Sequence, residues 1–104
     1  MPFIALEKVH ELHNGYCRVF PVAGRQLLLI HSNDQSYAID SICPHAGASL
    51  IKGKISGGCI RCPKHGIEFS LVNGVAQGGE VVADVAPLVF YRVAVEGDRV
   101  GIVL

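Results

Sequence analysis

The chain has 104 residues, of which half are hydrophobic, and its nine Lys and Arg residues balance its nine Asp and Glu residues. This length and this apolar content suffice for one packed core and exclude an intrinsically disordered chain. We therefore expect one domain spanning residues 1–104. A formal net charge of zero provides no general attraction for nucleic acid or an anionic membrane, so neither is an expected partner.

The distribution of apolar and cysteine residues indicates a soluble chain in a reducing compartment. The N-terminal residues lack a basic segment followed by a long apolar run, and no later segment approaches the roughly 18 apolar residues of a membrane span. Two of the four cysteines lie beside histidines at metal-ligand spacing, which differs from a disulfide framework. We therefore expect a cytoplasmic protein.

Short runs of β-branched, aromatic and aliphatic residues, separated by Gly, Pro and Asn, recur along the chain. Such runs are typical of strands, and the turns between neighbouring runs favour antiparallel hairpins. The sequence therefore predicts an all-β fold, a small antiparallel β-sandwich. The expected strands are residues 16–22, 25–31, 36–40, 59–61, 66–71, 88–95 and 99–104.

Four segments are less regular. Residues 28–30 are apolar without alternation and could belong to a buried helix, but the turn residues on both sides favour a strand. Residues 6–12 are a weak helical candidate of one turn. Residues 53–58 are predicted as a glycine-rich connector, and residues 78–87 as a long surface loop.

Two loops carry the residues best suited to binding a metal, Cys43-Pro-His45 and Cys62-Pro-Lys-His65. Each loop offers one thiolate and one imidazole, with a proline next to the cysteine. Thiolates suit zinc and iron–sulfur clusters, and imidazoles suit zinc and iron. Two loops at one end of a sheet would bring all four ligands to one site.

These loops resemble the cluster-binding loops of Rieske proteins, in which two cysteines hold one iron and two histidines hold the other. The resemblance to Rieske-type ferredoxins extends over nearly the whole chain. It also includes Ala48-Ser49-Leu50, Gly57-Gly58, residues 66–74, Pro87-Leu88 and the turn at Gly97-Asp98. It implies the Rieske form of the β-sandwich, with two cluster-binding loops at one end.

The resemblance also implies a cofactor, its ligands and a function. One [2Fe–2S] cluster would be held by Cys43 and Cys62 on the inner iron and by His45 and His65 on the outer iron. A ferredoxin of this kind is a monomeric one-electron carrier rather than an enzyme, and no residue is assigned a catalytic role. It takes electrons from an NAD(P)H-dependent flavoprotein reductase and passes them to a terminal oxygenase.

The sequence differs from the high-potential respiratory members of the family at positions that influence the reduction potential of the cluster. Those members have a disulfide at the positions of Ala48 and Lys64, and hydroxyl donors at the positions of Ile67 and Phe69. Without these donors the reduced cluster is stabilised less, so we expect a potential near the low end of the Rieske range. A smaller departure is Ser70, where the family often has Asp.

Other functions share parts of this pattern. The small subunit of an assimilatory nitrite reductase has the same fold, although many such subunits lack the ligands. A zinc-stabilised structural module would use the same four side chains in a Cys₂His₂ site. A third alternative is that the cysteines pack as small apolar residues while the histidines pack or cap turns.

The remaining candidates are weaker. Cys59-Ile-Arg-Cys62 matches a Cys-X-X-Cys motif, which could indicate redox chemistry or a third thiolate ligand, but Cys59 is expected on a strand. Cys17 is expected in the core, and the other histidines lack a partner pattern. Those histidines are His10, His13 and His31.

Positive charge is concentrated around the ligand loops. Between Cys43 and Ile67 there is no Asp or Glu, so we expect this end of the molecule to be positive although the whole chain is neutral. The basic residues in this segment are Lys52, Lys54, Arg61 and Lys64.

Overall fold

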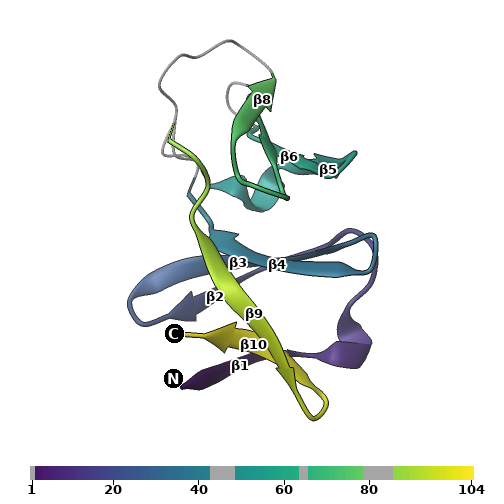
Figure 1. Cartoon of the computed structure of the whole chain (residues 1–104), viewed down its shortest axis with the longest axis vertical. Helices are drawn as coiled ribbons and strands as arrows, with labels where there is room; N and C mark the ends of the chain where they lie inside the picture. Colours follow the sequence, from purple (N-terminus) through teal and green to yellow (C-terminus); the bar gives the residue numbers. More distant parts are fainter. Residues whose placement is uncertain (1, 43–48, 64–65, 79–85) are drawn as a thin grey trace.

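The computed structural model describes residues 2–42, 49–63, 66–78 and 86–104. Within these ranges the chain forms two antiparallel sheets and two 3-10 helices, without an α-helix (Figure 1), which confirms the predicted all-β fold. None of these helices has the length and apolar character needed to cross a membrane. The elements are β1 (Phe3–Lys8), η1 (Val9–Glu11), β2 (Tyr16–Val22), β3 (Arg25–Ser32), β4 (Gln35–Asp40), η2 (Leu50–Lys52), β5 (Lys54–Ser56), β6 (Cys59–Arg61), β7 (Glu68–Ser70), β8 (Ala76–Gly78), β9 (Phe90–Glu96) and β10 (Arg99–Val103).

The larger sheet has the strand order β1-β10-β9-β4-β3-β2. Strands β2, β3 and β4 form consecutive hairpins, as the sequence predicts. The two turns consist of Ala23-Gly24 and Asn33-Asp34, and all four residues have positive φ. Two-residue turns with positive φ at both positions match the twist of the strands that they join.

The helical turn expected at residues 6–12 is wrong for its first three residues, which belong to strand β1. The strand continues through Lys8 and pairs antiparallel with β10, so that only Val9–Glu11 form a 3-10 turn. A bulge between Ala5 and Glu7 interrupts the pairing and obscures the alternation along the strand. Because β10 lies near the other end of the sequence, the local pattern around β1 does not reveal its partner.

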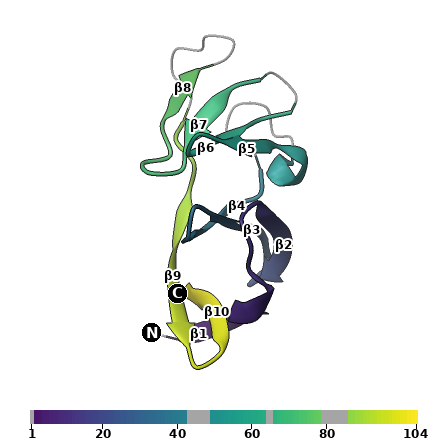
Figure 2. The same cartoon turned by 90° about the vertical axis from the view of Figure 1, so that its right-hand side faces the viewer.

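Hydrogen bonding between side chains links the two edge strands of the larger sheet, which curls as Figure 2 shows. The Tyr16 hydroxyl on β2 donates to Glu7 Oε2 on β1 at 2.7 Å, and Arg18 Nη1 donates to the same oxygen at 3.4 Å. The Tyr16 bond is the main reason that the pKa of Glu7 lies below its usual value. This polar contact stabilises the curled form of the sheet.

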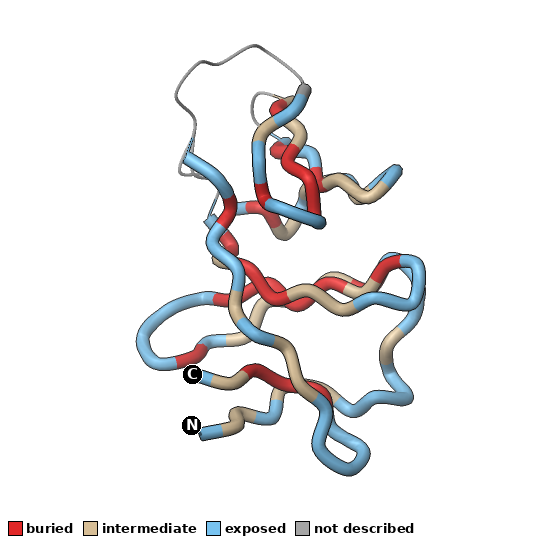
Figure 3. Tube along the Cα trace, in the orientation of Figure 1, coloured by how far each residue is buried: buried red, intermediate tan, exposed pale blue. Residues whose placement is uncertain are grey.

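Strand β3 is buried on both faces along its centre, where Figure 3 shows the tube in red. Leu27, Leu28, Leu29 and Ile30 are each at most 1% exposed. Leu27 and Leu29 belong to the apolar clusters within the larger sheet. Leu28 and Ile30 lie on the opposite face and pack in a third cluster that includes the smaller sheet. This double burial explains why residues 28–30 are apolar without alternation and confirms the strand.

The smaller sheet has the order β5-β6-β7-β8 and contains two strands that the sequence did not predict. The glycine-rich connector holds β5, because Gly57-Gly58 form a tight turn with positive φ that pairs it with β6. Strand β8 pairs with β7 and ends at Gly78, the first residue of the expected long loop. Residues 79–85 of that loop lie outside the described residues.

We predict that Tyr16→Phe lowers the free energy of unfolding at neutral pH by about 1–2 kcal/mol, because a part-buried hydrogen bond to a carboxylate is lost. Glu7 has a lowered pKa, so this contribution is present above pH 4.5, its ordinary pKa, and is lost as pH falls through the lower pKa of the folded state. Urea unfolding at neutral pH and at about pH 3 measures both effects.

Tyr37→Phe is the matched control. Tyr37 is half-buried, and its hydroxyl makes no hydrogen bond to the described residues, so its replacement should have little effect at either pH. Equal losses for the two variants, or a Tyr16→Phe loss that is unchanged at low pH, would show that the Glu7 bond does not stabilise the sheet.

Candidate metal centre

The first ligand loop leaves the larger sheet after β4 and returns into η2. Ile42 and Ser49 form an isolated antiparallel bridge across its base, and the Leu50 amide donates to the Ser41 carbonyl at 2.6 Å. The Ser49 hydroxyl oxygen then accepts a hydrogen bond from the Ile51 amide and caps η2. Backbone bonds therefore fix both ends of this loop.

The second ligand loop joins β6 to β7. The Cys62 amide donates to the Ile67 carbonyl at 2.8 Å, and the Gly66 amide donates to the Cys62 carbonyl at 2.9 Å. Gly66 has a φ of +70°, a left-handed conformation that glycine adopts without strain. These two bonds tie the residues that enter the loop to those that leave it.

The stems of the two loops lie against each other. Gly53, which follows η2, packs on β6 so closely that an added Cβ would lie 2.7 Å from the Arg61 carbonyl oxygen and 3.2 Å from Ile60 Cγ1. Leu50 of η2 and Cys62 belong to the same buried cluster. The segment that leaves the first loop is therefore packed on the strand that enters the second.

Of the four predicted ligands, the structure describes Cys62. Its side chain is free of disulfide bonding and fully buried. The other three predicted ligands, and the two positions where respiratory members have cysteine, lie outside the described residues. These positions are Cys43, His45, His65, Ala48 and Lys64.

The surroundings of Cys62 fit a ligand to a protected iron–sulfur cluster. Ile67 and Phe69 are at most 1% exposed and pack in the same cluster of side chains as Cys62. Apolar surroundings restrict the access of water to a metal site and influence its reduction potential. Neither Ile67 nor Phe69 offers a hydroxyl group that could donate a hydrogen bond to a cluster.

Cys59 and Cys17 have settings different from that of Cys62. Side chains alternate along β6, so Cys59 lies on the face opposite Ile60, where its Sγ accepts a hydrogen bond from Gln77 Nε2 at 2.8 Å. Cys17 packs against the main cluster from β2, and burial raises its pKa to about 11. Cys59 is thus a strand residue, and Cys17 is a core thiol that stays protonated at neutral pH.

The described histidines are associated with polar groups near the larger sheet. His31 Nδ1 lies 2.9 Å from Ser36 Oγ, and His13 Nδ1 lies 3.3 Å from the Glu11 carbonyl oxygen. His10 Nε2 lies 3.5 Å from the Glu11 carboxylate. These contacts place the three histidines away from the two loop stems.

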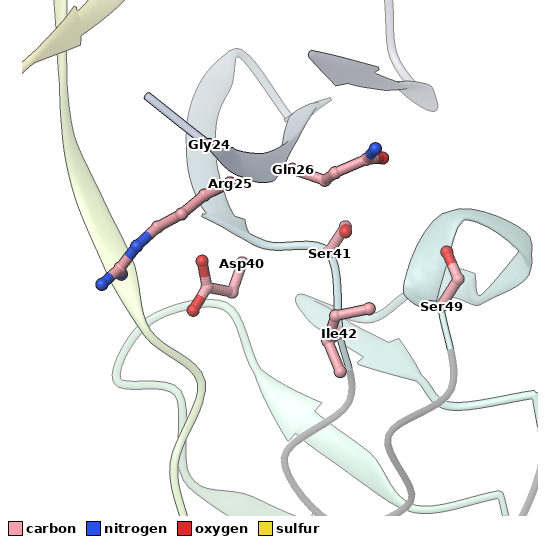
Figure 4. Close-up of a pocket in the computed structure, with 7 residues that line it drawn as sticks. All are labelled: Gly24, Arg25, Gln26, Asp40, Ser41, Ile42 and Ser49. Atoms are coloured by element: carbon pink, nitrogen blue, oxygen red, sulfur yellow. The ribbon is translucent and has the colours of Figure 1, made fainter. Parts of the chain in front are cut away.

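A pocket of about 420 Å³ lies beside the base of the first loop (Figure 4). Arg25 Nη1 donates to the Tyr91 hydroxyl at 2.9 Å, and that hydroxyl donates to Asp40 Oδ1 at 2.7 Å. The two charges therefore offset each other through one shared hydroxyl group. The pocket is lined by Gly24, Arg25, Gln26, Asp40, Ser41, Ile42 and Ser49, so none of the described thiols or imidazoles lines it.

Sequence reasoning missed the position of Arg61 beside the second loop. An added Cβ on Gly66 would lie 2.9 Å from Arg61 Nη2 and 3.2 Å from Nε, so the guanidinium lies against the Gly66 backbone. The sequence marks Arg61 as one of several basic residues, but no local pattern indicates where a long exposed side chain lies.

Comparisons with known proteins agree with this architecture. The chain matches the Rieske [2Fe–2S] domain family over residues 3–89. It is 31% identical over 92 residues to the ferredoxin component of the naphthalene 1,2-dioxygenase system of Pseudomonas aeruginosa, covering 88% of this chain and 86% of that protein. It is 34% identical over 95 residues to the ferredoxin component of the alkene monooxygenase system of Xanthobacter autotrophicus, covering 88% and 73%.

Much longer proteins also contain a similar segment. Mouse Apoptosis-inducing factor 3 is 39% identical over 66 residues, which cover 64% of this chain. The match spans only 11% of the length of that protein. The similarity therefore concerns the shared domain.

Solved structures show the same fold. The ferredoxin of carbazole 1,9a-dioxygenase from Nocardioides aromaticivorans IC177 has a TM-score of 0.84 and 26% identity, covering 98% of this chain and 97% of that one. A chain in the complex of reduced oxygenase and oxidized ferredoxin in carbazole 1,9a-dioxygenase has a TM-score of 0.81 and 28% identity, covering 93% and 97%. From the family match, the two ferredoxin relatives and the shared fold, we conclude that this chain belongs to the Rieske [2Fe–2S] domain family, whose cofactor is one [2Fe–2S] cluster.

Proposed function

We propose that this protein is a one-electron carrier of the Rieske ferredoxin type, with its cluster held by Cys43, His45, Cys62 and His65. The observation that carries the proposal is the contact between the two loop stems. Gly53 packs closely on β6, so the segment that follows the Cys-X-His loop adjoins the strand that ends at the Cys-X-X-His loop. Two such loops supply the mixed ligand set of a Rieske centre.

The cysteines and the histidines would bind different irons of this cofactor. Cys43 and Cys62 would bind the inner iron, which the full burial of Cys62 supports, and His45 and His65 would bind the outer iron. When bound, the cluster supplies the ability to accept and release one electron. The protein holds it in place, limits the access of water around Cys62, and provides an exit route for the electron on the histidine side.

The carrier would take electrons from an NAD(P)H-dependent flavoprotein reductase and deliver them to a terminal oxygenase, acting in the cytoplasm as a monomeric single domain of residues 1–104. Support comes from the ferredoxin components of the naphthalene and alkene systems and from the carbazole complex of oxygenase with ferredoxin. A putative small subunit of nitrite reductase has a TM-score of 0.78 and 22% identity, a likeness of fold alone.

We predict that Cys62→Ser loses most of its iron, acid-labile sulfide and visible absorption, because a thiolate ligand is removed. Cys59→Ser is the matched control, since Cys59 lies on β6, the strand that leads into the second loop, but its thiol is hydrogen-bonded to Gln77. The control should retain about two iron and two sulfide ions per chain. Equal losses in both variants, or a colourless wild-type protein with stoichiometric zinc, would contradict the ligand assignment.

We expect a midpoint potential below about 0 mV, within a Rieske range of about −150 to +300 mV, because neither Ile67 nor Phe69, which pack in the same cluster as Cys62, offers a hydroxyl donor. Replacing the two buried residues together, Ile67→Ser with Phe69→Tyr, should raise the potential because added donors stabilise the reduced form. Protein-film voltammetry measures the potential of each variant.

Val72→Ser is the control for this substitution. Val72 is 84% exposed, so a hydroxyl at this position should leave the potential unchanged. A wild-type potential well above about +100 mV, on the scale of the Rieske range, would contradict the low-potential account whether or not the double variant folds.

A further inference from the structure

Three exposed basic side chains surround the stems of the ligand loops: Lys52 at the end of η2, Lys54 on β5 and Arg61 on β6. We call these three residues the basic face. In the described residues from Ser49 to Gly78, the one acidic side chain is Glu68, which is half-buried. This part of the molecule is therefore positively charged, although the whole chain has a net charge of zero.

Two members of the basic face are directly opposed in the sheet. Lys54 and Arg61 are Cα partners in the antiparallel β5–β6 hairpin, so their side chains lie on the same face. The next pair, Ile55 with Ile60, packs into the main cluster on the other face. Like charges directly opposite each other disfavour strand pairing. The hairpin therefore maintains a charge arrangement that does not contribute to its own stability.

Nothing in the described residues neutralises this charge by a salt bridge. Glu68 is the partner of Arg61 on the adjacent strand, but the described ion pairs are His10–Glu11 and Arg18–Glu7, near η1 and the edge of the larger sheet. The Arg61 guanidinium lies instead against the backbone of Gly66, next in sequence to the proposed ligand His65.

We propose that the basic face is a docking surface for an acidic patch on the protein that exchanges electrons with this carrier. The contact of Arg61 with Gly66 makes the surface continuous with the second ligand loop, so a partner held there lies beside the electron's exit route. A neutral chain with a positive end is oriented by an acidic surface before contact. This inference rests on the proposed function, since it requires the cluster to lie between the two loops.

The sign of the charge around the exit route can be tested with two small oxidants. The holoprotein is reduced with dithionite and mixed by stopped flow with tris(oxalato)cobaltate(III), an anion, or with hexaamminecobalt(III), a cation. In each case one electron passes from the reduced protein to cobalt(III), giving cobalt(II). The ratio of the anion rate to the cation rate reports local charge, because a change in driving force affects both oxidants in the same direction.

The test variant is the pair Lys54→Glu with Arg61→Glu, and the control is Arg92→Glu with Arg99→Glu, which changes the net charge equally at exposed positions on β9 and β10. At low salt we expect the ratio of the anion rate to the cation rate to be at least about tenfold lower in the test variant than in the control. This difference between the two variants should shrink at about 1 M salt. Visible absorption confirms that each variant holds its cluster.

Equal ratios in the two variants would overturn the docking surface. If the charge reversal prevents cluster retention, the neutral variant Lys54→Gln with Arg61→Gln replaces it, and Arg92→Gln with Arg99→Gln is its control. We then expect the ratio to fall more in the variant than in the control, by less than for the charge reversal. A wild-type protein that accepts no electron from dithionite would instead overturn the proposed function. The two failures are therefore distinguishable.

Discussion

The burial of β3 on both faces is the constraint on which the rest of the structure depends. Leu27 and Leu29 pack within the curled larger sheet, while Leu28 and Ile30 pack toward the smaller sheet. Burying each such side chain contributes about 1.5–3 kcal/mol. The four strands of the smaller sheet have three residues each, too few to build a stable core alone, so this sheet depends on the apolar face that β3 presents.

This dependence determines where the ligand loops emerge. Leu50, at the exit of the first loop, and Cys62, at the entrance of the second, lie in the same apolar cluster as Leu28. Both loops are thereby anchored to one rigid support, which a precise metal site requires. Strand β6 has two roles, because Ile60 faces this cluster while Arg61 lies on the opposite face beside Gly66.

Much of this architecture could be predicted from sequence because strands with tight turns leave local patterns. The hairpins of β2, β3 and β4 are bounded by residues that adopt positive φ, and the spacing of cysteine and histidine indicates a Rieske centre. The strand at Phe3–Lys8 was missed because its partner is distant in sequence, and Lys54–Ser56 because three residues are too few to show a period. The contact of Arg61 with Gly66 depends on side-chain direction, which the sequence pattern does not encode.

The central claim is that two cysteines and two histidines from the paired loops hold one [2Fe–2S] cluster. Pulsed electron paramagnetic resonance of the dithionite-reduced protein, with nitrogen-15 confined to histidine, tests this claim most directly. The account predicts hyperfine coupling to the nitrogens of two histidines, unchanged in His31→Asn, because His31 lies on the larger sheet beside Ser36. A cluster whose spectrum is the same with and without labelled histidine would contradict the account.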